Sequence, residues 1–332
     1  MKILGIETSC DETATSVVED GTKILSSVVA SSLPLHAVSG GIIPEIAARE
    51  QLKAIIPVLE TAIREAGLKA ASIDAMAVTF GPGLIGSLLV GVETAKALSY
   101  VWNKPLVPVN HLVGHLYATW LENDAPPKFP LIVLIVSGGH TEIFLVTCHG
   151  YWKHLGGTRD DAAGETFDKM ARFLGLGYPG GPAIAESSTK GTPTAYNLPR
   201  PLIDSNDYDF SFSGLKTAVI NLVNKLNSKN AISKSRQNEN LAACIQEAIV
   251  DCLVVKTIRA AQIFDIKNIV VGGGVAAYQT LRTKMISEFT GKVYFSAPKF
   301  SIDNAAMIAS AAFFNYKPVS WKKIEVNAQI LV

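Results

Sequence analysis

The stretch PLIVLIVSGGHTEIFLVTCHGYWKHLGG, residues 130–157, decides the fold. It contains three β-rich segments, 130–136, 141–149 and 151–157, and a Ser-Gly-Gly turn separates the first two. Short runs rich in Val, Ile, Leu and Phe that are punctuated by tight glycine turns predict strands joined as a meander.

The first thirty residues follow the same plan. KILGIETS, TATSVVED and TKILSSVVAS again predict three strands, and ETSCDET stands where the later copy has its Gly/Ser turn. Helical patterns follow, although the two copies share little residue identity, so the repeat is structural. We expect an α/β fold of two lobes, each led by a duplicated β-meander. We place the N-terminal lobe at residues 1–108 and the C-terminal lobe at 109–332. We expect a nucleotide in the cleft between the lobes, because each glycine turn offers backbone N–H groups to phosphate.

Composition excludes several classes of protein. The chain has 332 residues, 48% of them hydrophobic and 18% charged, with a net charge of +1. This composition suits large cores and argues against disorder, and RNA binding would require a local basic patch. MKILGIETSC does not resemble a signal peptide, and the apolar run 84–101 carries Glu93 and Lys96, so we predict no membrane span. Four cysteines without CxxC spacing indicate a reducing compartment, and we expect a cytoplasmic protein.

VNHLVGHLY, residues 109–117, places His111 and His115 four residues apart. In a helix, both imidazoles would lie on one face, about 6 Å apart along the axis, which suits two ligands of one cation. The alternative is a helix with two ordinary histidines. Asp303, in SIDNAAM, is either a helix N-cap or a third ligand. Two histidines and one carboxylate form a set that suits Fe(II) or Zn(II), and we expect this metal site, like the nucleotide, in the inter-lobe cleft.

Three glycine-rich segments indicate a nucleotide or acyl-nucleotide ligand when taken together. They are IVSGGHTE (135–142), GLGYPGGP (175–182) and VGGGVA (271–276), each at the end of an expected strand or helix. Any one of them alone needs no ligand. Asp168, on an expected helix, either accepts a hydrogen bond from a ribose hydroxyl or pairs with a nearby lysine.

Two other classes compete with this interpretation. A zinc peptidase of the H-E-x-x-H type needs a glutamate as general base, and Leu112 occupies that position here. The other class is a non-catalytic ATP-binding scaffold or a sugar kinase. Glu7 argues against a kinase, since those enzymes usually carry Asp at this point of the first turn.

Eight motifs together resemble one family. They are GIETSCDETA (5–14), GPGLIGSLLVG (81–91), NHLVGHL (110–116), VSGGHTE (136–142), DDAAGETFDKMARFLGLGYPGGP (160–182), DFSFSGLKTA (209–218), VGGGVAA (271–277) and IDNAAMIA (302–309). In this order they resemble the bacterial TsaD family, the tRNA N6-adenosine threonylcarbamoyltransferases, over residues 3–316.

The resemblance implies an actin/Hsp70/sugar-kinase-like fold and an acyltransferase that acts in tRNA modification. The donor would be threonylcarbamoyl-AMP and the acceptor N6 of adenosine 37, in tRNAs that read codons beginning with A. The implied metal ligands are His111, His115 and Asp303, with Fe(2+) as the expected ion and Zn(2+) as the alternative, one ion per subunit. The implied substrate-binding residues are Ile135, Val136, Ser137, Gly138, Gly139, Asp168 and Gly181. Tyr278 departs from the pattern, because the family usually has Asn there, and this puts one polar contact in doubt.

The remaining expectations concern catalysis and partners. No general base is evident, and Asp11 and Glu12 are weak candidates. Phosphate contacts with tRNA are expected from basic residues: Lys216, Lys225, Lys229, Lys234, Arg236 and Arg200. The resemblance also implies a TsaB-like paralogous partner and a TsaE-like ATPase, so we expect little activity from this chain alone.

Overall fold

The chain folds into two compact units in a computed structural model that describes residues 1–227 and 234–332. Unit 1 comprises Met1–Pro127, Cys148–Tyr151 and Ser296–Val332, and unit 2 comprises Lys128–Thr147 and Trp152–Phe295. This division differs from the expected boundary between residues 108 and 109. Residues 109–127 and 296–332 group with unit 1, because the helices in them pack on the first sheet.

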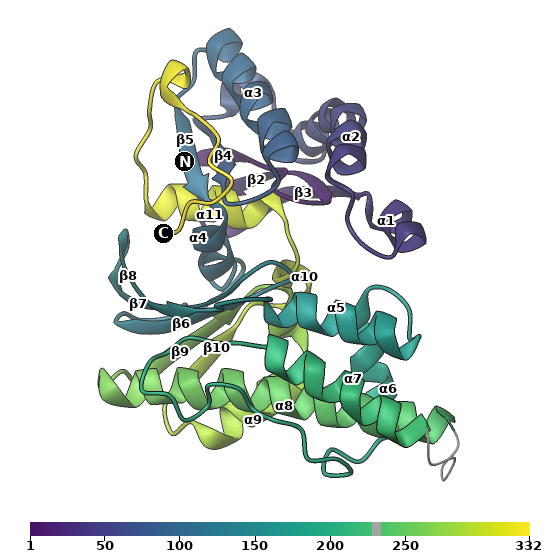
Figure 1. Cartoon of the computed structure of the whole chain (residues 1–332). Coiled ribbons are helices and arrows are strands. Elements are labelled where there is room, and N and C mark those ends of the chain that lie inside the picture. Colours follow the sequence, from purple (N-terminus) through teal and green to yellow (C-terminus); the bar gives the residue numbers. More distant parts are fainter. Residues whose placement is uncertain (228–233) are drawn as a thin grey trace. The chain divides into compact units, whose positions relative to one another are not determined.

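Unit 1 is built on a five-stranded sheet of order β3-β2-β1-β4-β5 (Figure 1). Its strands are β1 (Lys2–Glu7), β2 (Glu12–Glu19), β3 (Lys23–Ser31), β4 (Ala75–Gly81) and β5 (Leu106–Asn110). The first three strands pair antiparallel, and β4 and β5 add in parallel. Its helices are α1 (Leu33–Ser39), α2 (Pro44–Glu65), α3 (Ile85–Trp102), α4 (His111–Tyr117), α10 (Pro298–Ser301) and α11 (Ala305–Phe314), with short 3-10 turns at Ala70–Ser72 and Trp321–Lys323.

Helices cover both faces of the first sheet because β1 alternates between two cores. Leu4 and Ile6 share a buried cluster with residues of α2 and α3. Gly5 faces α11, and a Cβ on this glycine would lie 2.2 Å from the carbonyl oxygen of Ala305. The missing side chain therefore lets α11 approach the sheet closely, which determines where the residues just before α11 lie.

Unit 2 repeats the same topology with the strand order β10-β9-β6-β7-β8. Its strands are β6 (Leu131–Val136), β7 (Thr141–Cys148), β8 (Tyr151–Gly157), β9 (Asn268–Gly272) and β10 (Lys292–Phe295). Its helices are α5 (Ala163–Leu174), α6 (Gly180–Ser188), α7 (Ser213–Asn227), α8 (Lys234–Ile263) and α9 (Gln279–Glu288), with a 3-10 turn at Gly274–Ala277. β6 and β7 pair antiparallel, and β9 and β10 extend the sheet in parallel. The predicted duplicated, meander-led α/β fold is thus confirmed.

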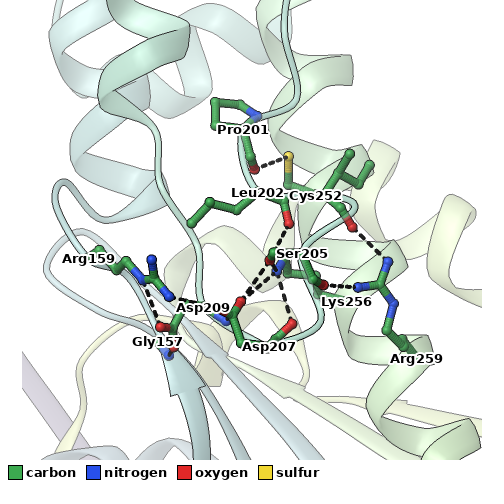
Figure 2. Close-up of polar contacts among 11 residues, drawn as sticks. Gly157, Arg159, Pro201, Leu202, Ser205, Asp207, Asp209, Cys252, Lys256 and Arg259 are labelled. Carbon is green, nitrogen blue, oxygen red and sulfur yellow. Dashed lines mark hydrogen bonds and ion pairs between the residues drawn. The ribbon is translucent and has the colours of Figure 1, made fainter.

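The abundance of Pro, Ser, Thr and Asn in residues 186–210 predicts an irregular segment, and after the end of α6 at Ser188 this segment is tied to α8 by polar side chains (Figure 2). The Lys256 ammonium donates to the Ser205 hydroxyl (2.8 Å) and to the Asp207 carbonyl (3.1 Å). Arg259 donates to the backbone carbonyls of Ser205 (2.6 Å) and Ile203 (2.7 Å). These side chains satisfy carbonyls that a segment without regular structure leaves open.

The polar, locally basic composition of residues 225–240 predicts a loop, and for the described part of this segment that prediction is wrong. α7 continues to Asn227 and α8 already begins at Lys234, while residues 228–233 lie outside the described residues. The polar residues 234–240 are the first turns of a long helix whose later turns are buried. Among the described residues, no helix combines the length and apolar character needed to cross a membrane.

Candidate functional site

The helix that carries the histidine pair, α4, begins directly after Asn110, a residue type that favours the N-cap position. Asn110 is the N-cap of α4, and its side-chain oxygen accepts a hydrogen bond from the N–H of Leu112 at 2.9 Å. His111 and His115 therefore stand one turn apart, with ring centroids 4.6 Å apart. Both are buried, with exposed fractions of 4% and 1%.

Asp303 completes the cluster. Its Oδ1 lies 3.6 Å from Nε2 of His111 and 3.4 Å from Nε2 of His115. The alternative expectation that Asp303 caps a helix is wrong, because the N-cap of α11 is Asn304, whose side chain accepts from the N–H of Met307 at 3.0 Å. The capping task falls to the neighbouring residue, and the Asp303 carboxylate is directed to the histidines.

The cluster fits a cation on evidence beyond its composition. One ligand atom from each of His111, His115 and Asp303 lies within 4.8 Å of the others. Within the described part of the chain, neither ring nitrogen of His115 makes a hydrogen bond, although both are buried. A buried polar atom without a partner costs about 1–3 kcal/mol, and coordination to a metal removes that cost. These three residues could therefore hold a metal ion.

Glu7 contacts the His111–His115–Asp303 cluster, and the sequence interpretation missed this role. This fully buried carboxylate places Oε2 3.2 Å from Nδ1 of His111 and accepts from the Thr79 hydroxyl at 2.5 Å. Ser9 adds its hydroxyl oxygen at 3.2 Å from the same ring nitrogen. A carboxylate behind a metal-binding histidine fixes the orientation of the ring. The available signal was a glutamate inside an otherwise apolar strand, KILGIE, which was interpreted only as a difference from kinases.

The same carboxylates set the protonation of His111. Burial alone would lower the pKa of His111, but Asp303 and Glu7 outweigh burial and raise its pKa to about 9. Because a histidine must lose this proton before it can bind a metal, metal binding will release protons.

The two weak candidates for a general base stay predictions. Burial, then Asp11 and Asp303, raises the pKa of Glu12 well above its usual value, and the Ser31 hydroxyl donates to it at 3.0 Å. A carboxyl that keeps its proton at neutral pH is not a ready base.

In unit 2, the Ser-Gly-Gly turn connects β6 to β7. Ile135 and Val136 are fully buried in β6, so their side chains cannot contact a ligand. A Cβ on Gly138 or Gly139 would meet nothing within 4 Å, and within the described residues no hydrogen bond uses their N–H groups. The N–H groups of Gly164 and Glu165, at the start of α5, donate to the carbonyls of Ser137 (3.2 Å) and Gly138 (3.1 Å). The carbonyl groups of the turn are thus anchored to α5, whereas the N–H groups of Gly138 and Gly139 make no hydrogen bond to any described residue.

The other glycine segments pack close to this turn and to α5. A Cβ on Gly273 would lie 2.4 Å from the carbonyl oxygen of Val136. Asp168 Oδ1 accepts from the N–H of Gly180 at 2.7 Å, which anchors the beginning of α6, and burial raises the pKa of Asp168. A Cβ on Gly181 would lie 1.3 Å from the hydroxyl oxygen of Tyr278.

Tyr278 therefore reaches across to α6 from the segment before α9. Its ring packs edge-on against Phe167, with centroids 5.4 Å apart, and burial followed by the charge of Asp168 raises its pKa. The structure thus gathers Ser137–Gly139, Asp168, Gly181 and Tyr278 at the carboxyl ends of β6 and β9, where ligands bind in α/β sheets.

The basic residues expected to contact tRNA differ in availability. Lys216 is paired with Asp161, and Arg200 binds Asp251 at 2.7 Å, so neither charge stands alone. Lys225, Lys234 and Arg236 are exposed, and Arg236 donates to the carbonyl of Lys190. Lys229 lies outside the described residues.

Solved structures share the fold. A HypF structure from T. kodakarensis aligns with a TM-score of 0.63 at 14% identity, covering 95% of this chain and 47% of that one. Component A of the (R)-2-hydroxyglutaryl-CoA dehydratase from Acidaminococcus fermentans aligns with a TM-score of 0.55 at 16% identity, covering 94% and 98%. At these identities the likeness concerns the fold alone, and it agrees with the actin/Hsp70/sugar-kinase-like architecture expected above.

Closer relatives identify the family. A protein from Thermomicrobium roseum is 48% identical over 95% of this chain and 92% of its own length. One from Syntrophomonas wolfei is 49% identical over 98% and 96%. Both are named tRNA N6-adenosine threonylcarbamoyltransferase, and the family model of that description matches residues 23–310. This chain belongs to the TsaD family of tRNA N6-adenosine threonylcarbamoyltransferases.

Proposed function

We propose that this transferase moves the threonylcarbamoyl group of threonylcarbamoyl-AMP to N6 of adenosine 37, in tRNAs that read codons beginning with A. The observation that carries the proposal is the His111–His115–Asp303 cluster, in which the buried His115 nitrogens make no hydrogen bond to any described residue, in a chain of this family. The peptidase alternative gains no support, because the position after His111 holds the buried apolar Leu112.

The reaction needs charge stabilisation more than redox chemistry. The N6 amine forms a bond to the carbonyl carbon of the mixed anhydride, the bond from this carbon to the phosphate oxygen breaks, AMP leaves, and N6 loses one proton. A divalent cation held by His111, His115 and Asp303 would supply Lewis-acid stabilisation of the negative charge. Glu7 and Ser9 keep the His111 ring in the orientation that presents Nε2 to the cation.

The residues of unit 2 would bind the nucleotide part of the donor. Gly138 and Gly139 can donate unused N–H groups to phosphate oxygens or to the developing oxyanion. Asp168, Gly181 and Tyr278, which lie together at the beginning of α6, would add polar groups to this proposed subsite. The proposal thus assigns the cluster of unit 1 and the turns of unit 2 to one reaction.

The proposed cofactor is one Fe(2+) ion per subunit, with Zn(2+) as the alternative, since both suit two imidazoles and one carboxylate. We also propose that activity requires a TsaB-like paralogue and a TsaE-like ATPase in the cytoplasm. Contacts between Lys225, Lys234 or Arg236 and tRNA phosphates would weaken as salt rises.

The test is mass spectrometry of nucleosides from total tRNA. Cells depleted of this protein should lose threonylcarbamoyladenosine and should regain it with the wild-type chain. His111→Ala should fail to restore it. His154→Ala, which changes a histidine paired with Glu142 in unit 2, is the matched control and should restore it. Undiminished modification after depletion, with no second gene product responsible, would overturn the proposal.

A further inference from the structure

The chain beyond α11 returns across unit 1 (Figure 1). We call residues 319–330 the strap. At its beginning, the N–H of Val319 donates to the carbonyl of Leu106, the first residue of β5, at 2.9 Å. Further on, the N–H of Asn327 donates to the carbonyl of Phe80 at 2.8 Å. Between these points Ile324, with an exposed fraction of 3%, packs into the core of the unit.

The strap lies directly on the turn that follows β4, residues 81–83. The N–H of Gly83 donates to the carbonyl of Ala328 at 3.2 Å. A Cβ on Gly81 would lie 1.9 Å from the carbonyl oxygen of Asn327, so the contact requires glycine at position 81. No residue with a side chain could occupy position 81 while the strap stays in place.

The other side of the turn lies against Ser9. A Cβ on Gly83 would lie 2.5 Å from the carbonyl oxygen of Ser9, which also accepts from the N–H of Leu84 at 2.8 Å. The turn is thus clamped between the strap and Ser9. A displacement of the strap would therefore change the contact between the turn and Ser9.

Ser9 in turn contacts His111, a member of the histidine cluster. Its hydroxyl lies 3.2 Å from Nδ1 of His111, and its N–H donates to Oε1 of Glu7 at 2.5 Å. The Ser9 hydroxyl thus faces Nδ1 of His111 directly, and the Ser9 N–H helps to hold the Glu7 carboxylate, whose Oε2 lies 3.2 Å from the same nitrogen. A continuous series of contacts runs from Asn327 through the 81–83 turn and Ser9 to a metal ligand.

We propose that the strap is a positioning element for the metal site, and that Asn327 acts through the 81–83 turn and Ser9 to hold His111 ready for the cation. The inference rests on the proposed metal site but extends it to residues beyond the 23–310 span that the family model matches. Residues behind a metal ligand commonly change metal affinity by about 10- to 100-fold. Ser9 is the residue behind the ligand, and the strap acts two contacts further away, so we expect the low end of that range.

The experiment compares Zn²⁺ affinity by competition with a chelator, well below the melting temperature of every variant. Gly81→Ala should push the strap from the turn and weaken Zn²⁺ binding roughly 10-fold. Gly86→Ala is the matched control, because its Cβ would meet one neighbour at 3.3 Å, and it should leave the affinity unchanged. Asn327→Pro removes the donor to Phe80 and should act like Gly81→Ala, whereas Asn327→Ala keeps that backbone donor and should bind like wild type.

A double-mutant cycle separates positioning from general loss of stability. If the strap acts through Ser9, Gly81→Ala should have little further effect on Zn²⁺ affinity in a Ser9→Ala background. Full additivity of the two changes, or a lower melting temperature of Gly81→Ala with unchanged Zn²⁺ affinity, would overturn the inference. A wild-type chain that binds no Zn²⁺, Fe²⁺ or Co²⁺ would overturn the metal site itself, a result distinct from a failure of the strap alone.

Discussion

The buried position of His115 should lower the stability of the metal-free protein, and a single substitution can measure this effect. It is buried, and its two ring nitrogens have no hydrogen-bond partner among the described residues, so the metal-free chain bears an unsatisfied polar group. We expect His115→Leu, which has a similar volume, to leave the metal-free protein equally stable or to stabilise it by about 1 kcal/mol. The substitution should also abolish stabilisation by added Zn²⁺. Chemical denaturation with and without Zn²⁺ measures both effects, and a metal-free variant that is strongly destabilised would contradict this account.

Gly181 and Tyr278 form a pair in which each restricts the other. A Cβ at 181 would lie 1.3 Å from the tyrosine hydroxyl, so Gly181→Ala should cost about 1–3 kcal/mol through overpacking. Adding Tyr278→Asn, which shortens the side chain, should recover most of that cost. Thermal unfolding of the two single variants and the double variant measures the coupling. Equal losses from Gly181→Ala in both backgrounds would show that Tyr278 does not occupy this position.

At this scale the sequence identifies residue types more readily than their partners. The spacing of His111 and His115 was informative because a helix converts a separation of four residues into one face. Glu7 could not be assigned in the same way, since it meets His111 across 104 positions of sequence through the pairing of β1 with β4 and of β4 with β5. A contact between distant segments depends on topology, which local pattern does not contain.

Among elements, the strands of both meanders were predictable because buried runs of Val, Ile and Leu end at glycine or polar turns. The long α8 was harder to predict. Its first turns, KSRQNEN, carry a polar composition typical of loops, and its burial comes from packing with α5, α6 and α9. Asn304 rather than Asp303 caps α11 for a related reason: either residue can cap, and the tertiary position of the carboxylate decides.

Lys256 connects α8 to residues 205–207, and removal of the Lys256 side chain should weaken this connection. Its fully buried ammonium donates to Ser205 and Asp207 (Figure 2). We expect Lys256→Ala to lower the free energy of unfolding by about 2–3 kcal/mol, because buried acceptors lose their donor while the partly exposed Asp207 can still reach water. Lys267→Ala, in a fully solvated pair with Asp265, should change it by less than about 0.5 kcal/mol. Urea unfolding of both variants decides, and similar effects would contradict the assigned role.

The Asp161 carboxylate, which pairs with Lys169 of α5 and Lys216 of α7, should make the stability of the protein depend on pH in the acid range. Burial alone would raise the pKa of Asp161, but Lys169 and Lys216 outweigh it and hold the pKa below its usual value. A lowered folded-state pKa means that this carboxylate stabilises the protein above its unfolded-state pKa of about 3.9, and that the contribution disappears as pH falls through the folded value. Asp161→Asn should therefore reduce stability at pH 7 and flatten the decline below about pH 4. Asp265→Asn, at an exposed pair, should leave the acid-unfolding midpoint unchanged, and an unaltered pH profile for Asp161→Asn would refute the assignment.

Across the whole molecule, two sheets of the same strand order carry different chemistry at corresponding points. The first meander supplies Glu7 and Ser9 behind the histidine cluster, and the second supplies the Ser-Gly-Gly turn. The duplication was predictable from the repeated pattern of strands and turns. The division of the chain into two units was not predictable, since residues 296–332 return to the first unit after the second is complete. A chain that crosses back cannot be divided by one boundary in sequence.

This division predicts how each ligand should protect the backbone from hydrogen exchange. All three residues of the histidine cluster lie in unit 1, whereas Ser137–Gly139, Asp168, Gly181 and Tyr278 lie in unit 2. A ligand at 100 times its Kd stabilises the binding unit by about 2.7 kcal/mol, so exchange through unfolding of that unit slows about 100-fold. Zn²⁺ alone should slow exchange in peptides of α4 and α11, and AMP alone should slow it in peptides spanning 135–142 and 164–182. Added to the Zn²⁺-loaded chain, a non-hydrolysable analogue of the acyl-adenylate should slow exchange in the unit 2 peptides, and should slow it in the peptides of α4 and α11 beyond the effect of Zn²⁺ alone. If the analogue adds nothing to the protection of α4 and α11, the cation takes no part in the transfer step and has a structural role.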